Sequence, residues 1–265
     1  MTVSASSGGH VAASVSRWPK RPPVLTAEQA RAREEFVRVW HEVMPERLGF
    51  IERFNQGFVA RLPMRPEART LEVGPGLGAQ ARWRGAGGDG YVCLEERESF
   101  CEVLREILPR EAVFQGDIQE RQPWPDGHFE RVIAIHILEH LKDLPAALAE
   151  IERLLAPDGC FDVVIPTEGG LAYALGRKLS AERLFRKRFR MDYTPIRLNE
   201  HVSTFSEIAS ELERVFRVER RAFYPLIVPI PTINLFVGYR LRKKALGGLF
   251  RAKEGSSGEV VGRVG

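Results

Sequence analysis

The sequence has few of the features that mark a secreted or membrane-spanning protein. Its three cysteines, Cys93, Cys101 and Cys160, are odd in number and scattered among 265 residues. This argues against a disulfide framework and against a CxxC zinc site. The longest apolar run, Leu226–Tyr239, is broken by two prolines and is shorter than the roughly 20 residues of a membrane helix. Residues 1–16 lack a charged segment followed by an apolar core, so we expect no signal peptide and a cytoplasmic location.

The composition is that of a globular protein. Hydrophobic residues make up 44% and charged residues 28%, which excludes a mostly disordered, collagen-like or coiled-coil chain. The length indicates one domain, or one domain with an added subdomain. A chain of this size buries enough surface to fold without disulfides or metals.

The net charge of +4 conceals two strongly basic segments. Residues 177–190 hold seven basic residues and one acid, and residues 240–265 hold seven basic residues and two acids. The rest of the chain therefore sums to −7. A local basic excess of this kind favours an anionic partner.

Short apolar segments alternate with stretches of helical spacing through the middle of the chain. Such alternation indicates a parallel sheet with helices on both faces. The carboxyl ends of all parallel strands then share one edge, where ligands bind. Strands are predicted at Thr70–Val73, Tyr91–Leu94, Ala112–Phe114, Arg131–Ile135 and Cys160–Ile165, and helices from Ala79 onward and at Glu98–Ile107, His136–Leu141 and Leu144–Leu155.

Two helices are predicted before the first strand. Thr26 and Gln29 fit a capping box, so a helix should begin there. Pro45 is expected to end it, and a second helix is expected over Leu48–Ala60.

A glycine-rich loop follows the first strand. Gly74-x-Gly76-x-x-Ala79 satisfies the dinucleotide fingerprint, and Glu95 lies 21 residues past Gly74, where a ribose-binding acid belongs. Missing side chains let the backbone approach a ligand closely. Taken alone, the loop fits a nicotinamide dinucleotide, another nucleoside ligand, or a turn with no ligand.

The surrounding motifs resemble those of class I S-adenosylmethionine-dependent methyltransferases, in particular the methyltransferase type 11 family. Six motifs occur in order over residues 70–166. They are the glycine loop Leu71–Ala79, the acid-ended strand Tyr91–Glu95, Gly116–Ile118, the entry PWPDGHFE at Pro123–Glu130, the segment IHILEHL at Ile135–Leu141, and the turn LLAPDGC at Leu154–Cys160.

The resemblance implies S-adenosylmethionine as cofactor and S-adenosylhomocysteine as product. Glu72 would repel a pyrophosphate but can attract the ammonium group of this cofactor, whereas a dinucleotide prefers a bare helix N-terminus. Glu95, or Glu96 if the strand ends one residue later, would hold the ribose hydroxyls. The implied cofactor-binding residues are Glu72, Gly74, Pro75, Gly76, Gly78, Glu95, Glu96, Asp117, Ile118 and His136.

The implied fold is a Rossmann-like α/β domain with a seven-stranded doubly wound sheet in the order 3-2-1-4-5-7-6, the seventh strand antiparallel. The last two strands would lie near Phe216–Phe223 and Leu235–Tyr239. The predicted organisation is a disordered tail over residues 1–25, a domain over 26–245 with leading helices at 26–66 and a helical substrate cap at 167–202, and a disordered basic tail over 246–265.

Two histidines are candidates for catalysis. His136, at the end of the fourth strand, can act as a base near neutral pH, or it can shape the methionine pocket. His201, before a helix expected to start near Ser203 or Ser206, can orient the acceptor, or it can be a structural contact. Glu168 and Tyr173, just past the fifth strand, could also face the acceptor.

A metal site is not predicted. His136, Glu139 and His140 have the i, i+3, i+4 spacing of metal ligands. Some ubiquinone-pathway O-methyltransferases use acids in this region for a metal, but this chain has His136 where they have an acid.

The basic, amphipathic segment 172–189 has three interpretations: a solvated face, a surface for an anionic acceptor, or peripheral contact with an anionic membrane such as the inner membrane face. The predicted function is methylation of a small molecule or of a glycan or lipid precursor, with O-methylation favoured. Nucleic-acid methylation is an alternative, although the chain has no Asn/Asp-Pro-Pro-Tyr motif. The second alternative is a partner subunit that binds the cofactor but does not catalyse methyl transfer.

Overall fold

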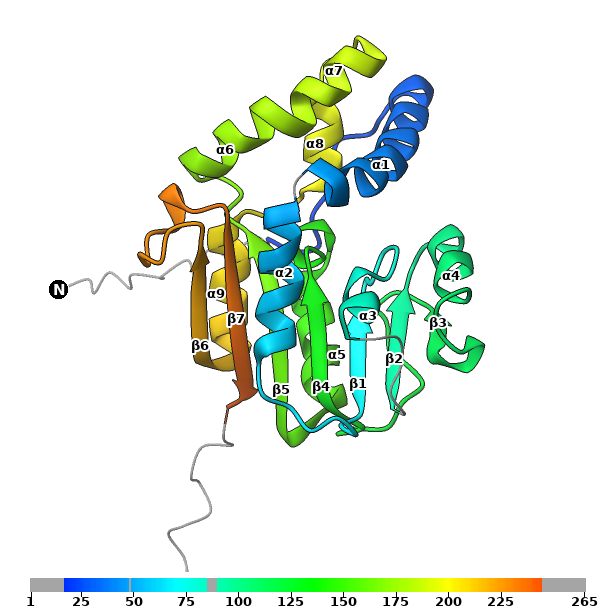
Figure 1. Cartoon of the computed structure of the whole chain (residues 1–265), viewed down its shortest axis with the longest axis vertical. Helices are drawn as coiled ribbons and strands as arrows, with labels where there is room; N and C mark the ends of the chain where they lie inside the picture. Colours follow the sequence, from blue (N-terminus) through cyan, green and yellow to red (C-terminus); the bar gives the residue numbers. More distant parts are fainter. Residues whose placement is uncertain (1–16, 48, 85–89, 245–265) are drawn as a thin grey trace, which may run out of the picture.

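A computed structural model describes residues 17–47, 49–84 and 90–244 (Figure 1). One seven-stranded sheet runs through the molecule in the order β3-β2-β1-β4-β5-β7-β6, which confirms the predicted topology. Residues 1–16 of the predicted first tail, and the whole predicted second tail, lie outside the described residues. The strands are β1 (Thr70–Val73), β2 (Tyr91–Glu95), β3 (Val113–Gln115), β4 (Phe129–Ile135), β5 (Leu155–Pro166), β6 (Phe216–Tyr224) and β7 (Phe236–Lys243).

The register brings the carboxyl ends of the parallel strands to one edge. Val73, the last residue of β1, lies opposite Leu94 of β2 and Ala134 of β4. Strands β1 to β5 are parallel, and β7 pairs antiparallel with both β5 and β6. The loops that follow β1, β2 and β4 therefore meet at this edge.

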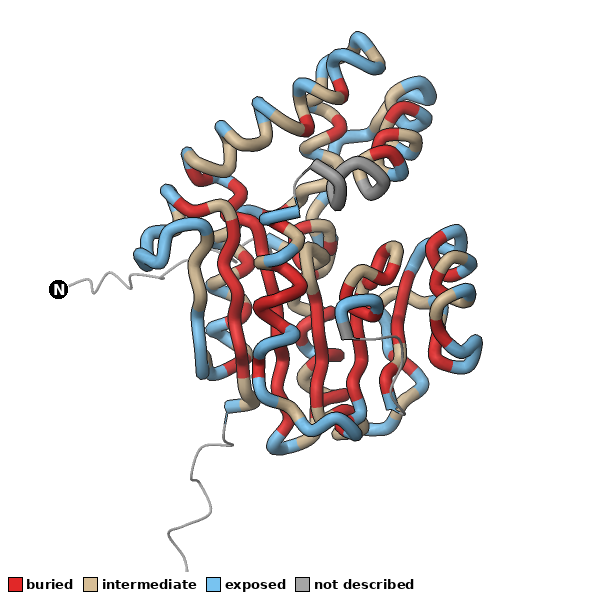
Figure 2. Tube along the Cα trace, in the orientation of Figure 1, coloured by how far each residue is buried: buried red, intermediate tan, exposed pale blue. Residues whose placement is uncertain are grey.

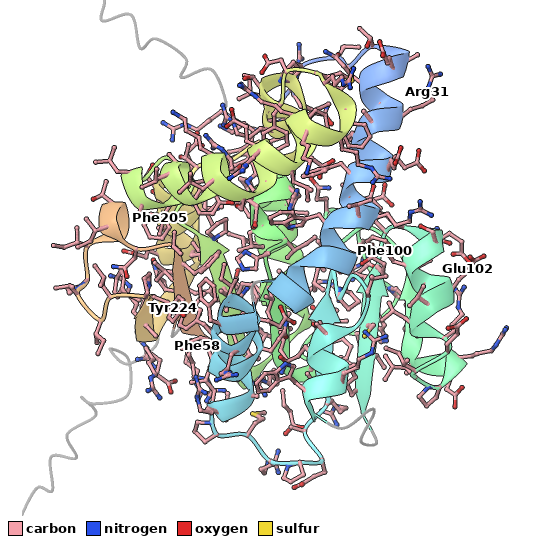
Figure 3. The ribbon with its side chains drawn as sticks, turned by 45° about the horizontal axis from the view of Figure 1, so that its top comes forward. Arg31, Phe58, Phe100, Glu102, Phe205 and Tyr224 are labelled. Carbon is pink, nitrogen blue, oxygen red and sulfur yellow. The ribbon has the colours of Figure 1, made fainter. Side chains whose placement is uncertain are left out.

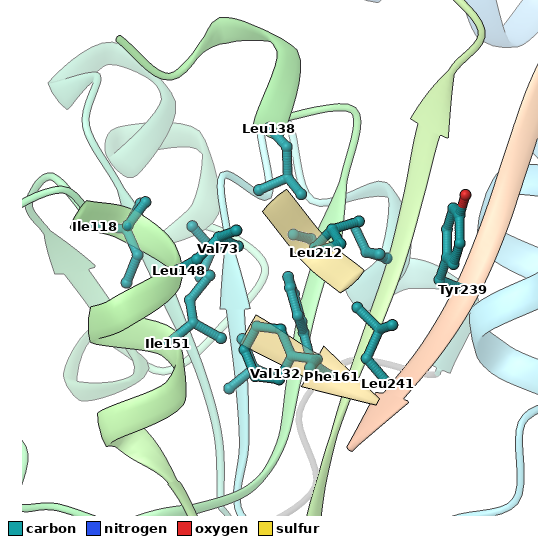
Figure 4. Packing of buried hydrophobic residues seen from close by; sticks show 14 of the residues in the cluster. Val73, Ile118, Val132, Leu138, Leu148, Ile151, Phe161, Leu212, Tyr239 and Leu241 are labelled. Atoms are coloured by element: carbon teal, nitrogen blue, oxygen red, sulfur yellow. The ribbon is translucent and has the colours of Figure 1, made fainter. Parts of the chain in front are cut away.

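Helices cover both faces of the sheet because each presents one apolar face. On one face, α5 (Leu144–Leu154) and α9 (Phe205–Val215) pack on the central strands, with Leu148 and Leu212 completely buried (Figure 4). On the other face lie α2 (Gly49–Arg61), α3 (Ala79–Arg84) and α4 (Glu98–Leu104). The parallel strands β1, β2, β4 and β5 are buried over most of their length, as a sheet covered on both faces requires, whereas the edge strand β6 is mostly exposed or half-buried (Figure 2).

A helical layer lies above the carboxyl ends of the strands (Figures 1 and 3). It has a small core of its own, in which Phe36 meets Phe185 edge-on with ring centroids 5.2 Å apart, and Ile196 is 1% exposed. We call this layer the cap. Its elements are α1 (Ala27–Arg47), α6 (Leu171–Arg177), the π-helical turn η3 (Lys178–Glu182), α7 (Arg183–Phe189) and α8 (Thr194–Glu200).

Three local predictions were wrong. Helix α1 passes Pro45 and ends at Arg47, since a proline near a helix end removes only one backbone hydrogen bond. Residues 136–141 form no α-helix, because His136 has a left-handed φ of 54°, and only the 3-10 turn η2 (Leu138–His140) follows. Strand β5 begins at Leu155, not at Cys160, and residues 156–159 interrupt its register with β4.

The structure also shows how helix α1 begins and what residues 17–25 contact. The capping box is present, because Thr26 and Gln29 exchange backbone-to-side-chain hydrogen bonds of 2.9 and 3.2 Å. Residues 17–25, part of the predicted tail, contact the domain: the Lys20 backbone N–H donates to the Lys142 carbonyl at 2.7 Å. Lys20 also pairs with Glu207 at 2.6 Å.

Candidate active site

The glycine loop leaves the end of β1 in a conformation that few other residues adopt. Gly74, Gly76 and Gly78 have φ values of 63°, 57° and 76°, in the left-handed region that favours glycine. A Cβ on Gly74 would lie 2.5 Å from the Ile137 side chain, and one on Gly78 would lie 2.5 Å from Ile107. The loop therefore depends on glycine for its backbone and for its packing.

Glu95 is fastened to this loop. Its Oε2 accepts the Gly76 N–H at 3.1 Å, and its Oε1 accepts the Arg97 N–H at 3.0 Å. Burial raises the pKa of this carboxyl although these two donors oppose the shift. Strand β2 ends at Glu95, and Glu96 is exposed. Of the two acids, Glu95 is the one that lies beside the glycines.

The other predicted cofactor residues divide into two groups. Pro75 lies within the loop, and the Asp117 carboxylate follows β3 and accepts hydrogen bonds from Gln119 at 2.9 to 3.0 Å. Glu72 instead accepts the Tyr91 hydroxyl in a buried pair, and Ile118 packs in the main core at 3% exposure. The side chains of Glu72 and Ile118 are thus already engaged inside the domain.

His136 follows β4 in a strained conformation. A left-handed φ is unusual for histidine and costs roughly 1–3 kcal/mol. Its Nδ1 lies 3.4 Å from Glu139 Oε1, and its ring meets Phe236 edge-on at 5.0 Å. Its Nε2 is buried and has no hydrogen-bond partner among the described residues. A hydrogen-bonding group on a bound molecule could therefore satisfy this nitrogen.

Glu139 is a buried carboxylate surrounded by histidines. Burial alone would raise its pKa, but the contact with His136 and the charges of His140 and His201 outweigh it, and the pKa is about 2. Its Oε2 has no hydrogen-bond partner in the described part of the chain. The carboxylate is ionised and only partly satisfied.

His201 lies between the cap and the sheet. It follows α8, and its Nδ1 is 3.1 Å from Glu168 Oε2. Glu168 follows β5 and also pairs with Arg177 at 2.8 Å and Arg197 at 3.4 Å. Tyr173 of α6 stacks at 6.5 Å from the His201 ring, and burial raises the pKa of its hydroxyl well above 10. The structure therefore brings together His201, Glu168 and Tyr173, each of which the sequence analysis considered separately as able to face the acceptor.

Several residues of this site were not predicted from the sequence. Glu200 lies 3.4 Å from His140 Nδ1 and 3.4 Å from Arg33 of α1. The hydrogen bond to Glu200 raises the pKa of His140, although burial opposes the shift. Glu200 precedes His201 directly, and this adjacency was the only signal available. Arg33 lies more than 160 residues away along the chain, so no local pattern could reveal it.

An exposed apolar surface lies beside the cap. Helix α6 begins against the loop between β6 and β7, where the Thr167 hydroxyl donates to the Asn234 carbonyl at 2.5 Å. Buried Asn234 shapes that loop by donating to the Val228 and Ile230 carbonyls, both at 2.9 Å. We call the following side chains, exposed by between 39% and 93%, the apolar surface: Leu171, Leu175, Leu179, Leu226, Ile227, Val228, Ile230 and Ile233.

Basic residues continue this surface along the same helical segment. Among and beyond the exposed leucines of α6 and η3, the exposed basic residues of this segment are Lys178, Arg183, Arg186, Lys187 and Arg188. Within the described residues, no helix combines the length and the apolar character needed to cross a bilayer.

Comparison with known proteins identifies the central part of the chain. Residues 71–163 match the family model described as a methyltransferase domain. Over 107 residues the chain is 33% identical to the ubiquinone/menaquinone biosynthesis C-methyltransferase UbiE of Cupriavidus necator, covering 38% of this chain and 44% of that protein. Over 104 residues it is 34% identical to the malonyl-[acyl-carrier protein] O-methyltransferase of Erwinia pyrifoliae, covering 39% of each. The matches span less than half of either relative.

A solved structure extends the likeness in fold. The crystal structure of an S-adenosylmethionine-dependent methyltransferase from Thermotoga maritima aligns with a TM-score of 0.55 and 20% identity. The alignment covers 81% of this chain and 99% of that one. At this identity the likeness shows the fold, which is the one that the sequence predicted.

Proposed function

We propose, from the match of residues 71–163 to the methyltransferase-domain family model, that this chain transfers a methyl group from S-adenosylmethionine to a small-molecule acceptor. The observation that supports this most directly is the hydrogen bond from the Gly76 N–H to Glu95. It joins the glycine loop and the acid that ends β2, the two features that a bound nucleoside would contact.

The residues at the sheet edge suit this cofactor. The loop has no side chains at Gly74, Gly76 and Gly78, so its backbone can lie against a ligand. Each Glu95 oxygen accepts one backbone N–H and keeps a lone pair for a ribose hydroxyl. Asp117 follows β3, where it can accept a hydrogen bond from the adenine amino group. The cofactor, when bound, supplies an electrophilic methyl group and a sulfur leaving group.

We assign a hydroxyl as the acceptor and His136 as its base. The bond from oxygen to the methyl carbon forms as the carbon–sulfur bond breaks, and the sulfur keeps the bonding electrons. The hydroxyl proton passes to His136 Nε2, which is buried and has no hydrogen-bond partner in the described ranges. Glu139 orients the ring through Nδ1, and His201 holds the acceptor under the cap.

The acceptor is a lipid precursor or another amphiphile presented at an anionic membrane. The support is the apolar surface beside the cap, with Ile227 93% and Leu171 76% exposed. Contiguous exposed apolar side chains mark an interaction surface. Basic positions follow them along the same helix, which suits anionic headgroups.

Calorimetric titration with S-adenosylmethionine, S-adenosylhomocysteine and NADH tests the cofactor. The two adenosyl ligands should bind the wild type, and Glu95→Gln should weaken them by about 10- to 100-fold, as expected for hydrogen bonds to a charged group. Glu96→Gln is the matched control and should bind normally. Binding of NADH alone would overturn the assignment.

Co-sedimentation with vesicles tests the membrane contact. The chain should bind vesicles containing phosphatidylglycerol better than pure phosphatidylcholine vesicles, and the double variant Leu175→Ser/Ile227→Ser should lose at least about tenfold in binding. Val24→Ser is the control, because Val24 is 97% exposed but lies outside the apolar surface. Equal binding by all three chains would contradict the proposed surface.

Two other functions remain testable with the same protein. Salt-sensitive retention on RNA or DNA would favour nucleic-acid methylation, since the basic segments would then contact phosphates. Cofactor binding without methyl transfer to any acceptor pool, lipid extracts included, would favour a partner subunit that does not catalyse.

A further inference from the structure

Three side chains from two distant segments converge beside the proposed base. Glu139 and His140 lie in η2 after β4, and His201 lies between α8 and α9. One ligand atom from each lies within 4.8 Å of those of the other two. The Val202 and Ser203 N–H groups donate to the Glu139 carbonyl at 2.9 and 3.3 Å, which holds the two segments together.

Each histidine has a carboxylate on its Nδ1. His140 Nδ1 lies 3.4 Å from Glu200 Oε2, and His201 Nδ1 lies 3.1 Å from Glu168 Oε2. Such carboxylate–histidine pairs fix the ring orientation and leave Nε2 to bind a metal. They are the usual surroundings of metal-bound histidines.

The charges divide the carboxylates into outer and inner groups. The outer acids are neutralised by arginines: Glu200 pairs with Arg33 and Arg97, and Glu168 with Arg177 and Arg197. The inner acid, Glu139, pairs with no arginine or lysine among the described residues. It is 1% exposed, and its Oε2 has no hydrogen-bond partner there. A buried, unpartnered carboxylate oxygen requires an explanation.

We propose that Glu139, His140 and His201 bind a divalent first-row transition-metal ion through one carboxylate oxygen and two imidazole nitrogens. Nitrogen ligands favour such an ion over Mg²⁺ or Ca²⁺, and a two-histidine, one-carboxylate set leaves positions open. Bound ligand atoms would lie roughly 3–3.5 Å apart at metal–ligand distances of about 2.1 Å, so the side chains must move inward by up to about 1.5 Å.

The open positions give the site a use. This inference rests on the proposed function and specifies how His201 holds the acceptor: an acceptor oxygen would bind the metal held by Glu139, whose other oxygen contacts His136. The substrate class is then a hydroxyl compound with a second oxygen nearby, because two oxygens can occupy two open positions on the ion.

Metal titration of the full, tag-free chain tests the site. After treatment with a chelator and its removal, the chain is titrated with Co²⁺ and Zn²⁺ by calorimetry and, for Co²⁺, by visible absorption. We expect one ion per chain, binding weakened more than about 100-fold by His201→Asn and by Glu139→Gln, and about 10- to 100-fold by the positioning variant Glu168→Gln. His128→Asn, at the opposite end of β4, is the control and should bind normally.

Titration of the same chains with S-adenosylhomocysteine separates this inference from the proposed function. Cofactor binding in every variant shows that each is folded. Cofactor binding by a wild type that takes up no metal would overturn the metal site alone, as would equal metal affinity in wild type and ligand variants. Metal uptake without cofactor binding would support the site and contradict the proposed function.

Discussion

Two buried charged clusters of this protein differ in how completely their polar atoms are paired. In the first, Asp162 of β5 lies between Arg131 of β4 and Arg240 of β7, with four carboxylate–guanidinium contacts of 2.7 to 2.8 Å. The guanidinium groups also donate to the Val59 and Pro63 carbonyls at 2.6 and 2.9 Å. None of these three side chains has a buried polar atom without a hydrogen bond.

The second cluster, around Glu139, lies at the carboxyl edge of the same sheet. It leaves His136 Nε2 and Glu139 Oε2 without partners among the described residues, and it includes a strained backbone. The first cluster therefore joins α2 to three strands. The second cluster keeps polar atoms available to a ligand. Buried charge alone does not distinguish them; the unpaired atoms do.

The largest expected effect follows from breaking the first cluster. Asp162→Asn leaves two buried guanidinium groups without a counter-charge, and we expect the free energy of unfolding to fall by about 3–5 kcal/mol. Urea denaturation followed by circular dichroism measures it. Asp158→Asn makes the same chemical change at an exposed position, so its stability should stay within about 0.5 kcal/mol of the wild type. A loss below about 1 kcal/mol in Asp162→Asn would mean that the first cluster does not stabilise the fold.

A change in the second cluster should affect turnover far more than stability. His136→Gly relieves roughly 1–3 kcal/mol of left-handed strain. It also loses a ring contact with Phe236 worth about 0.5–1.5 kcal/mol and a contact with buried Glu139 worth about 1–3 kcal/mol. Because these effects oppose one another, we expect the free energy of unfolding to fall by no more than about 2 kcal/mol. Methyl transfer should fall by about 10²-fold or more, measured as S-adenosylhomocysteine formed with lipid extracts of the source organism.

His136→Asn is the companion variant, because asparagine tolerates a left-handed backbone. It should also be inactive and close to the wild type in stability. Full activity in both variants would remove His136 from the role of base.

The smallest effect on stability is expected at the half-buried ion pair of Lys20 and Glu207. Its effect is the reference with which the effects of changes in the two clusters are compared. The Lys20 and Thr204 hydrogen bonds lower the pKa of Glu207 although burial opposes them. A carboxyl with a lowered pKa in the folded state stabilises the protein above its unfolded pKa near 4.5, and that contribution is lost as the pH falls below it.

Glu207→Gln should therefore reduce stability at pH 7 by no more than about 1 kcal/mol and converge with the wild type toward pH 3. Parallel thermal unfolding curves between pH 3 and 7 test this. A difference that persists unchanged at pH 3 would show that the effect is one of packing, not of charge.

The sheet was predictable because each central strand is a short apolar run between turn residues. Thr70–Val73 has the same bounds in sequence and structure, and Glu95 was found because the acid ends such a run. Strand β5 was misjudged at its start, since a bulge with proline, aspartate and glycine resembles a turn in sequence.

The second cluster was only half predictable. His136 and His201 were identified from their positions near predicted element ends, but their partners come from contacts across the fold. Arg33 of α1 pairs with Glu200, and Glu168 pairs with His201, which lies 33 residues further along the chain. Pairings of this kind depend on how the cap packs on the sheet. The local periodicity of the sequence does not encode that packing.

The composition of the cap has a consequence for synthesis of the chain. Phe36 leaves the ribosome early, yet its partner Phe185 follows 149 residues later, a delay of roughly 7–30 s at about 5–20 residues per second. Phe36 lacks its Phe185 partner throughout that interval, during which the glycine loop and Glu95 are synthesised. Helix α1 is thus a segment that a nascent-chain chaperone would have to shield. The cap can assemble over the acceptor site only after the first strands of the sheet and their loops have been synthesised.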